Sequence, residues 1–132
     1  MIIKKYLSLV LILFIFSTSL LGKEAPIPAK DKVIKQYILI GFKTGIKPAQ
    51  INEIKEQAMA LAKKTRTLKK VEWGKRADIT DNTKDYGYCL IFEFKNDADF
   101  EIFQENPLRI ELMGRIYPIA KKTLKFTYHV IK

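Results

Sequence analysis

The sequence predicts an α+β fold in which two helices cover one face of a four-stranded sheet. Four segments are rich in β-branched and aromatic residues, which favour strands. Two other segments repeat apolar residues at helical spacing. The chain has 132 residues, of which 48% are hydrophobic and 29% are charged, and its net charge is +10. This composition is typical of one globular domain and excludes a disordered chain.

A change of periodicity separates the first strand from the first helix. Residues 34–42 (IKQYILIGF) favour a strand, and Gly45 breaks it. Pro48 suits the first turn of a helix. An amphipathic helix is therefore predicted over residues 48–64, where the apolar residues at helical spacing are Ile51, Ile54, Ala58, Leu61 and Ala62.

Two strands follow, joined by a polar loop. Residues 71–77 (VEWGKRA) favour a strand with Trp73 and Lys75 on one face, and residues 78–85 form the loop. Residues 86–94 (YGYCLIFEF) are the strongest strand signal in the chain. Because this segment is apolar on both faces, we expect it to be a central strand that is covered on both sides.

A divided helix and a last strand complete the pattern. Asn96 or Asp97 can cap a helix whose inward residues are predicted to be Phe100, Ile102 and Phe103. Pro107 interrupts it, and a second helical piece runs through Met113. Apolar and polar residues alternate over residues 124–130, which predicts a half-buried strand.

This βαββαβ order is that of the ferredoxin-like α+β sandwich. The helices cover one face of its sheet and leave the other face without cover. Because the strands are apolar on both sides, we expect a second copy of the chain to cover the remaining face.

The first 22 residues are predicted to be a secretory signal peptide. Lys4 and Lys5 precede a short apolar stretch that ends in small residues, and cleavage is expected after Gly22, with Ser19 as the alternative. The apolar stretch, residues 6–21, is shorter than the ~20 residues of a membrane-spanning helix. The mature protein is therefore expected to be periplasmic or secreted, with residues 23–33 as a linker, a net charge of +8 and no stable membrane span.

The composition also bounds the chemistry of the protein. Cys89 is the single cysteine and His129 the single histidine. These counts exclude an internal disulfide and a Cys-rich or multi-histidine metal site. We therefore predict no metal and no cofactor.

The same element order occurs in the RNA-recognition fold. Residues 84–89 (KDYGYC) look like the start of its third-strand motif. However, Ile91 stands where that motif needs an aromatic residue, and the first strand lacks the matching Asn. Export would also remove the protein from cellular RNA, so nucleic-acid binding is not expected.

An ordered set of short segments runs along the chain: ILIGFK at 38–43 with Gly45 and Pro48, VEWGK at 71–75, FEFK at 92–95, residues 97–103 followed by NPLR at 106–109, and LKFTY at 124–128. Through these segments, residues 34–130 resemble the stress-responsive dimeric α/β-barrel (Dabb) family. The resemblance implies a homodimer in which two sheets pair into a closed barrel, which would supply the missing cover.

The resemblance also points to a site. A plant polyketide cyclase with this fold has a Tyr and a His as its proposed acid–base groups, and here the matching positions hold Phe103 and Arg109. The other family histidine positions hold Gln36, Tyr88 and Asn106. Phe has no ionisable group and Arg stays protonated, so no catalytic residue is assigned. These five residues are instead predicted to line a pocket.

The sequence thus predicts an exported, non-enzymatic homodimer with a small apolar ligand in its pocket. One alternative is an enzyme of the polyketide cyclase or monooxygenase class that uses Tyr88, Asn106 and Arg109 in place of histidines. Another is a protein that binds an anionic surface or nucleic acid through the basic stretch of residues 63–76. The simpler interpretation of that stretch is a solvated face.

Overall fold

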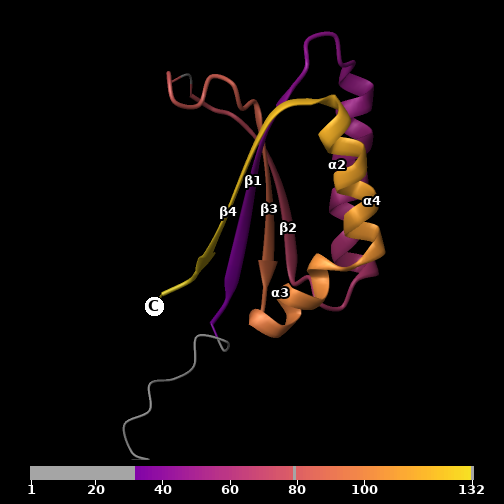
Figure 1. Cartoon of the computed structure of the whole chain (residues 1–132), viewed down its shortest axis with the longest axis vertical. Helices are drawn as coiled ribbons and strands as arrows, with labels where there is room; N and C mark the ends of the chain where they lie inside the picture. Colours follow the sequence, from indigo (N-terminus) through magenta and orange to yellow (C-terminus); the bar gives the residue numbers. More distant parts are fainter. Residues whose placement is uncertain (1–31, 79, 132) are drawn as a thin grey trace, which may run out of the picture.

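The computed structural model describes residues 32–78 and 80–131 (Figure 1). The predicted signal peptide and most of the predicted linker lie outside the described residues. The elements follow one another in the order β1 (Ile34–Phe42), α2 (Pro48–Lys64), β2 (Lys70–Lys75), β3 (Tyr88–Phe94), α3 (Asp97–Gln104), α4 (Pro107–Ile116), the short 3-10 helix η2 (Tyr117–Ile119) and β4 (Ala120–His129). The predicted α+β, ferredoxin-like order is confirmed, with its second helix divided at Pro107.

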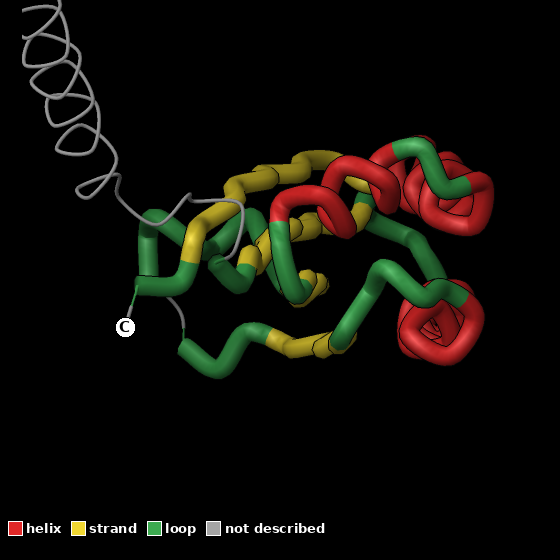
Figure 2. The backbone as a smooth tube through the Cα atoms, turned by 90° about the horizontal axis from the view of Figure 1, so that it is seen from below, coloured by secondary structure: helices red, strands yellow, loops and turns green. Residues whose placement is uncertain are grey.

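The four strands form one antiparallel sheet in the order β2-β3-β1-β4. The strand predicted to be central, β3, lies between β2 and β1. Figure 2 shows the helices gathered on one side of this sheet. Because successive side chains of a strand point to opposite faces, each strand has one helix-facing set of residues and one set on the other side.

The core lies between the helices and the sheet. β1 and β3 bring Ile38, Leu90 and Phe92 to the helix-facing side, and all three are buried. The ring of Phe103 in α3 lies 5.2 Å from the rings of Phe92 and Phe94. Burying one such side chain stabilises the fold by roughly 1.5–3 kcal/mol. The helices add Ile54, Ala58, Leu61, Leu112, Met113 and Ile116.

Local sequence signals set the helix ends. Gly45 has φ of +91°, so it allows the tight turn between β1 and α2. Asn96 caps α3 as predicted, since its side chain accepts a hydrogen bond of 2.9 Å from the Asp99 backbone N–H.

One expectation about the inward residues of α3 is wrong: Ile102 is 60% exposed. Phe100 and Phe103 are three residues apart and share the inward face, whereas Ile102 turns away from both.

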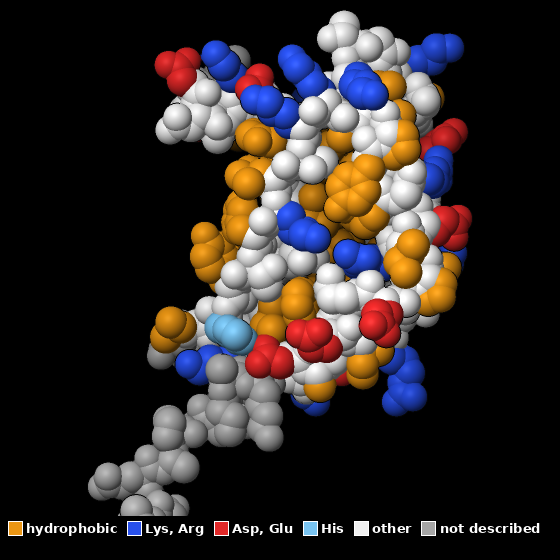
Figure 3. Space-filling view, in the orientation of Figure 1, with side chains coloured by type: hydrophobic (Ala, Val, Ile, Leu, Met, Phe, Trp, Pro, Cys, Tyr) orange, Lys and Arg blue, Asp and Glu red, His pale blue; other side chains and the backbone are white. Residues whose placement is uncertain are grey.

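The side of the sheet without helices is called the open face. Its apolar side chains are those of Tyr37, Leu39, Cys89, Ile91, Leu124, Phe126 and Tyr128. Figure 3 shows hydrophobic side chains along the left margin of the molecule, on the side of β4 and away from the helices. The alternation predicted for β4 is present, but its apolar side faces outward, and Leu124 and Tyr128 are 46% and 59% exposed. In one chain, β4 is therefore not buried on its apolar side.

A loop of residues 76–87 projects over one end of the open face (Figure 1). The loop spans the whole of the predicted polar loop of residues 78–85, in which residue 79 lies outside the described residues, and both flanking strands are shorter than predicted. Lys122 of β4 holds the loop through a 3.0 Å ion pair with Asp85. Gly41 of β1 allows a close approach, since a Cβ there would lie 1.8 Å from the Asp85 carbonyl oxygen. No helix in the part of the chain that the structure describes is long and apolar enough to cross a membrane.

Candidate functional site

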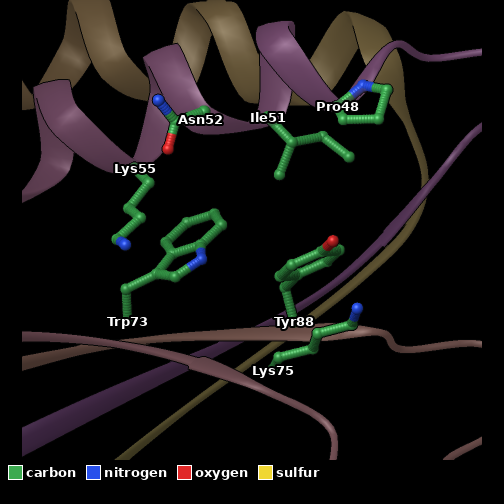
Figure 4. Close-up of a pocket in the computed structure, with 7 residues that line it drawn as sticks. All are labelled: Pro48, Ile51, Asn52, Lys55, Trp73, Lys75 and Tyr88. Atoms are coloured by element: carbon green, nitrogen blue, oxygen red, sulfur yellow. The ribbon is translucent and has the colours of Figure 1, made fainter.

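A pocket of about 360 Å³ opens between α2 and the β2–β3 edge of the sheet (Figure 4). The residues that line it come from three elements. They are Pro48, Ile51, Asn52 and Lys55 of α2, Trp73 and Lys75 of β2, and Tyr88 of β3.

The strand pattern places the aromatic part of this pocket. Trp73 and Lys75 are two residues apart and share the helix-facing side of β2. Tyr88 pairs with Lys75 across the two strands, so it lies on the same side. The ring centroids of Trp73 and Tyr88 are 5.6 Å apart at a tilt of 36°. The ring of Phe42 packs edge-on against Tyr88 at 5.4 Å and supports it.

The lining supports binding through apolar contact and hydrogen bonds. Ile51 and Pro48 lie on the helix side of the two rings in Figure 4. Asn52, the two lysines and the Tyr88 hydroxyl supply polar groups. The lining holds no His, Asp, Glu or Cys, the residue types most often used for acid–base or nucleophilic chemistry near neutral pH.

Of the five predicted site residues, Tyr88 lines this pocket and the other four do not. Gln36 is buried in β1, and its side-chain amide donates to the Thr127 hydroxyl at 3.4 Å. Phe103 is fully buried in the core. That these five residues share one ligand site stays a prediction.

The remaining two have contacts at the start of α4. Asn106 caps the helix, and its side chain accepts a 2.8 Å hydrogen bond from the Leu108 backbone N–H. The Arg109 guanidinium donates to the backbone carbonyl oxygen of Gln104 at 3.0 Å. Both side chains hold the junction between α3 and α4.

The sequence held a signal for two pocket residues that were not singled out. Lys55 follows Ile51 by four residues, so both share one face of α2. Lys75 follows Trp73 by two residues and shares its face of β2. Neither the spacing on α2 nor the spacing on β2 shows that these two faces come together, because their contact depends on how α2 crosses the sheet.

A second, smaller cavity of about 160 Å³ lies between the open face and the loop of residues 76–87. Leu39, Tyr86 and Cys89 contribute to its walls. Cys89 is half-buried in one chain. Burial raises the pKa of the Cys89 thiol, so it stays protonated at neutral pH.

The basic stretch of residues 63–76 does not form one continuous surface. β2 runs back along α2 (Figure 1), so Lys63 and Lys64 lie at the C-terminal end of the helix, whereas Lys75 lines a pocket together with Pro48, at the N-terminal end of the helix. Between them, Lys69 pairs with Glu93 at 3.4 Å and Lys70 with Glu72 at 3.5 Å.

His129 has an acidic partner that its sequence neighbourhood does not show. Its Nε2 atom lies 2.7 Å from Oδ1 of Asp97 in α3. Both side chains are partly exposed, and neither lines the pocket. Within residues 32–78 and 80–131, no group of three His, Cys, Asp or Glu side chains is placed to hold a metal ion.

Several solved structures share this fold at low sequence identity. A protein of Arabidopsis thaliana is 21% identical with a TM-score of 0.69, and the match covers 75% of this chain and 96% of that one. A hydroxynitrile lyase of Passiflora edulis is 18% identical with a TM-score of 0.68, covering 77% and 96% of the two chains. A dimeric ferredoxin-like protein of unknown function from Thermobifida fusca is 13% identical with a TM-score of 0.66, covering 81% and 99%.

At these identities the solved structures establish the fold alone. A comparison with curated proteins found no significant match. The family model described as Stress responsive A/B Barrel Domain matches residues 34–130, the same range over which the sequence resembles Dabb proteins. This chain therefore belongs to the stress responsive A/B barrel (Dabb) family.

Proposed function

We propose that this protein is an exported homodimer that binds a small molecule in the pocket between α2 and the sheet and does not transform it. The observation that carries the proposal is the pocket itself. It joins two packed aromatic rings, those of Trp73 and Tyr88, with polar groups, and it holds no His, Asp, Glu or Cys side chain.

The open face supports the homodimer. Tyr37, Phe126 and Tyr128 form a cluster there, with ring centroids 5.2–6.2 Å apart. A contiguous apolar surface of this kind marks an interaction site in a water-soluble domain. Solved structures with this fold from Thermobifida fusca, Jannaschia and Bacteroides fragilis are described as dimeric. Pairing two open faces would build a closed barrel and bury both clusters.

Export is supported by the sequence of residues 1–22, with its positive start and short apolar stretch. Cell fractionation tests it directly. The protein should be recovered outside the cytoplasm, with an N-terminus at or near Lys23. Recovery of the full-length chain in the cytoplasm would contradict export.

The absence of turnover is inferred from the pocket lining. The hydroxynitrile lyase of Passiflora edulis shows that an enzyme can have this fold, but 18% identity carries no reaction to this chain. Catalysis by general acid–base chemistry needs a group whose pKa lies near the working pH. The pocket lining holds no His, Asp, Glu or Cys, the residue types that most often supply such a group.

The single tryptophan gives a direct test of binding. Trp73 is the one Trp of the chain and lines the pocket, so its fluorescence reports an occupant. We expect some members of a panel of one- and two-ring aromatic compounds to change this fluorescence saturably and to be recovered unchanged. Ile51→Tyr should abolish the response by filling the pocket.

Met59→Tyr is the matched control, because Met59 lies on the same helix, is 40% exposed and does not line the pocket. It should leave the response intact. A panel without a saturable response, or a response that survives Ile51→Tyr, would overturn the binding site. Recovery of a chemically changed compound would overturn the non-enzymatic proposal.

A further inference from the structure

We propose that the pocket selects an anion with a flat apolar body, such as a carboxylate on an aromatic ring, and this inference rests on the proposed function above. The anionic group would lie beside Lys55 or Lys75, which stand at opposite ends of the pair of rings in Figure 4, and the ring of the ligand would lie against Trp73 and Tyr88. The site is distinct from the positions that correspond to family acid–base groups, Phe103 and Arg109, which have the other contacts described above.

The lining of the pocket carries two positive charges, those of Lys55 and Lys75. Lys55 extends from α2 towards Trp73, and Lys75 lies on the sheet side beside Tyr88 (Figure 4). Among the residues that the structure describes, neither lysine forms an ion pair, in contrast to Lys69, Lys70 and Lys122. Two ammonium groups with no acidic group beside them in the lining attract an anion.

The acidic side chains of α2 and β2 lie outside the lining of the pocket. Glu53 of α2 points towards α4, where its carboxylate lies 3.3 Å from Arg115. Glu56 lines the groove between α2 and α4. On the sheet, Glu72 belongs to the opposite face of β2 and pairs with Lys70. None of these three carboxylates lines the pocket, and Asp78, which lines the neighbouring cavity together with Lys75, does not line it either.

The apolar part of the pocket, formed by Trp73, Tyr88 and Ile51, has a shape that fits a flat ring. The Trp73 and Tyr88 rings are tilted by 36° and held on the sheet, and Ile51 faces them from the helix. A ring can pack against these faces in an offset arrangement, which aromatic pairs prefer. A pocket of about 360 Å³ lies at the small end of the range for ligand sites, which fits a molecule of one or two rings.

The test uses two probes that differ in charge and share one shape. Binding of 4-(trifluoromethyl)benzoate and of its neutral amide, 4-(trifluoromethyl)benzamide, to residues 23–132 is measured by fluorine NMR. We expect the benzoate to bind about ten-fold more tightly than the amide, and to weaken as salt rises. Lys55→Gln or Lys75→Gln, whichever lysine the carboxylate contacts, should lower benzoate affinity several-fold, and both variants should leave amide affinity unchanged.

Lys63→Gln is the control, since Lys63 lies on the same helix at its far end and does not line this pocket. It should change neither affinity. Equal affinity for the two probes, unaffected by the lysine variants, would overturn the anion preference. It would not contradict the proposal that the pocket binds a small molecule. Failure of both probes would also overturn this inference. The proposed function falls with it only if the wider aromatic panel leaves Trp73 fluorescence unchanged.

Discussion

Both faces of the sheet carry apolar side chains, but the helices cover only one of the two faces. On the helix-facing side, Leu90 and Phe92 are fully buried under the helices. On the open face, the aromatic side chains of Tyr37, Phe126 and Tyr128 pack only against one another and their neighbours in the sheet, and Tyr128 is 59% exposed. One chain thus completes one hydrophobic layer and leaves the second unfinished.

The helix-facing side of the sheet is therefore expected to stabilise the fold of one chain, and the open face to stabilise its association with a partner. Burial of apolar surface is worth roughly 25 cal/mol per Å², and the helix-facing layer gains it within one chain. The open face gains it only when another surface covers it. Substitutions on the two faces should therefore affect different properties, namely stability on one side and association on the other.

The largest effect is expected from the helix-facing layer. Phe92→Ala removes a fully buried ring that contacts Phe94 and Phe103, so it should lower the free energy of unfolding by about 3–5 kcal/mol. Chemical denaturation measures this. Ile102→Ala, at a 60% exposed position, should change it by less than about 0.5 kcal/mol. Equal effects of the two substitutions would contradict the assignment of the core.

A substitution on the open face should weaken the association of two chains and leave the fold of each chain intact. Phe126→Lys places a charge at the centre of the aromatic cluster, 5.2 Å from Tyr37 between ring centroids in the native chain. We expect the variant to stay folded by circular dichroism and to have half the native mass in light scattering. A variant that kept the native mass would show that this face is not the interface.

The loop over the open face gives a smaller effect. Gly41→Ala would bring a Cβ to 1.8 Å from the Asp85 carbonyl oxygen, so the loop of residues 76–87 must move. We expect a loss of about 1–3 kcal/mol in unfolding free energy. Gly87→Ala is the matched control, because a Cβ there meets nothing within 4 Å. Similar melting temperatures for the two variants would rule out the close approach.

The smallest effect concerns the ion pair that holds the same loop. The hydrogen bond from Lys122, and then its charge, lower the pKa of Asp85, and Asp85 raises the pKa of Lys122 in return. The contribution of the pair to stability is therefore present near neutral pH. It is lost as pH falls through the lowered pKa of Asp85 and as pH rises through the raised pKa of Lys122.

NMR titration of the Asp85 carboxyl signal checks this pair. Lys122→Gln should return the Asp85 pKa to the ordinary range of an aspartate, whereas Lys121→Gln should have a much weaker effect, because Lys121 acts on Asp85 through charge alone. An Asp85 pKa that does not respond to Lys122→Gln would show that the loop is held by other contacts.

Much of the fold followed from the sequence because its signals are local. The bounds of β1 and α2 agree with the prediction, since a β-branched run, Gly45, Pro48 and a helical apolar period mark them. Ile102 was misplaced because its apolar character outweighed its angular position on a short helix. The exposure of β4 was missed because alternation shows which residues share a face and not what covers it.

The candidate site was harder to predict because it depends on contacts between distant elements. Tyr88 was singled out through the family resemblance, but Lys55 and Trp73 are 18 residues apart and meet only through the crossing of α2 over β2. The partner of His129, Asp97, lies 32 residues away. No periodicity in the sequence reports such pairs.

The central claim is that the open face is covered by a second copy of the same chain. Sedimentation equilibrium of residues 23–132 over a range of concentrations tests it most directly. We expect a single species with twice the mass of one chain. A single species with the mass of one chain, at concentrations up to the highest measured, would contradict the claim and leave the aromatic cluster of the open face exposed to solvent.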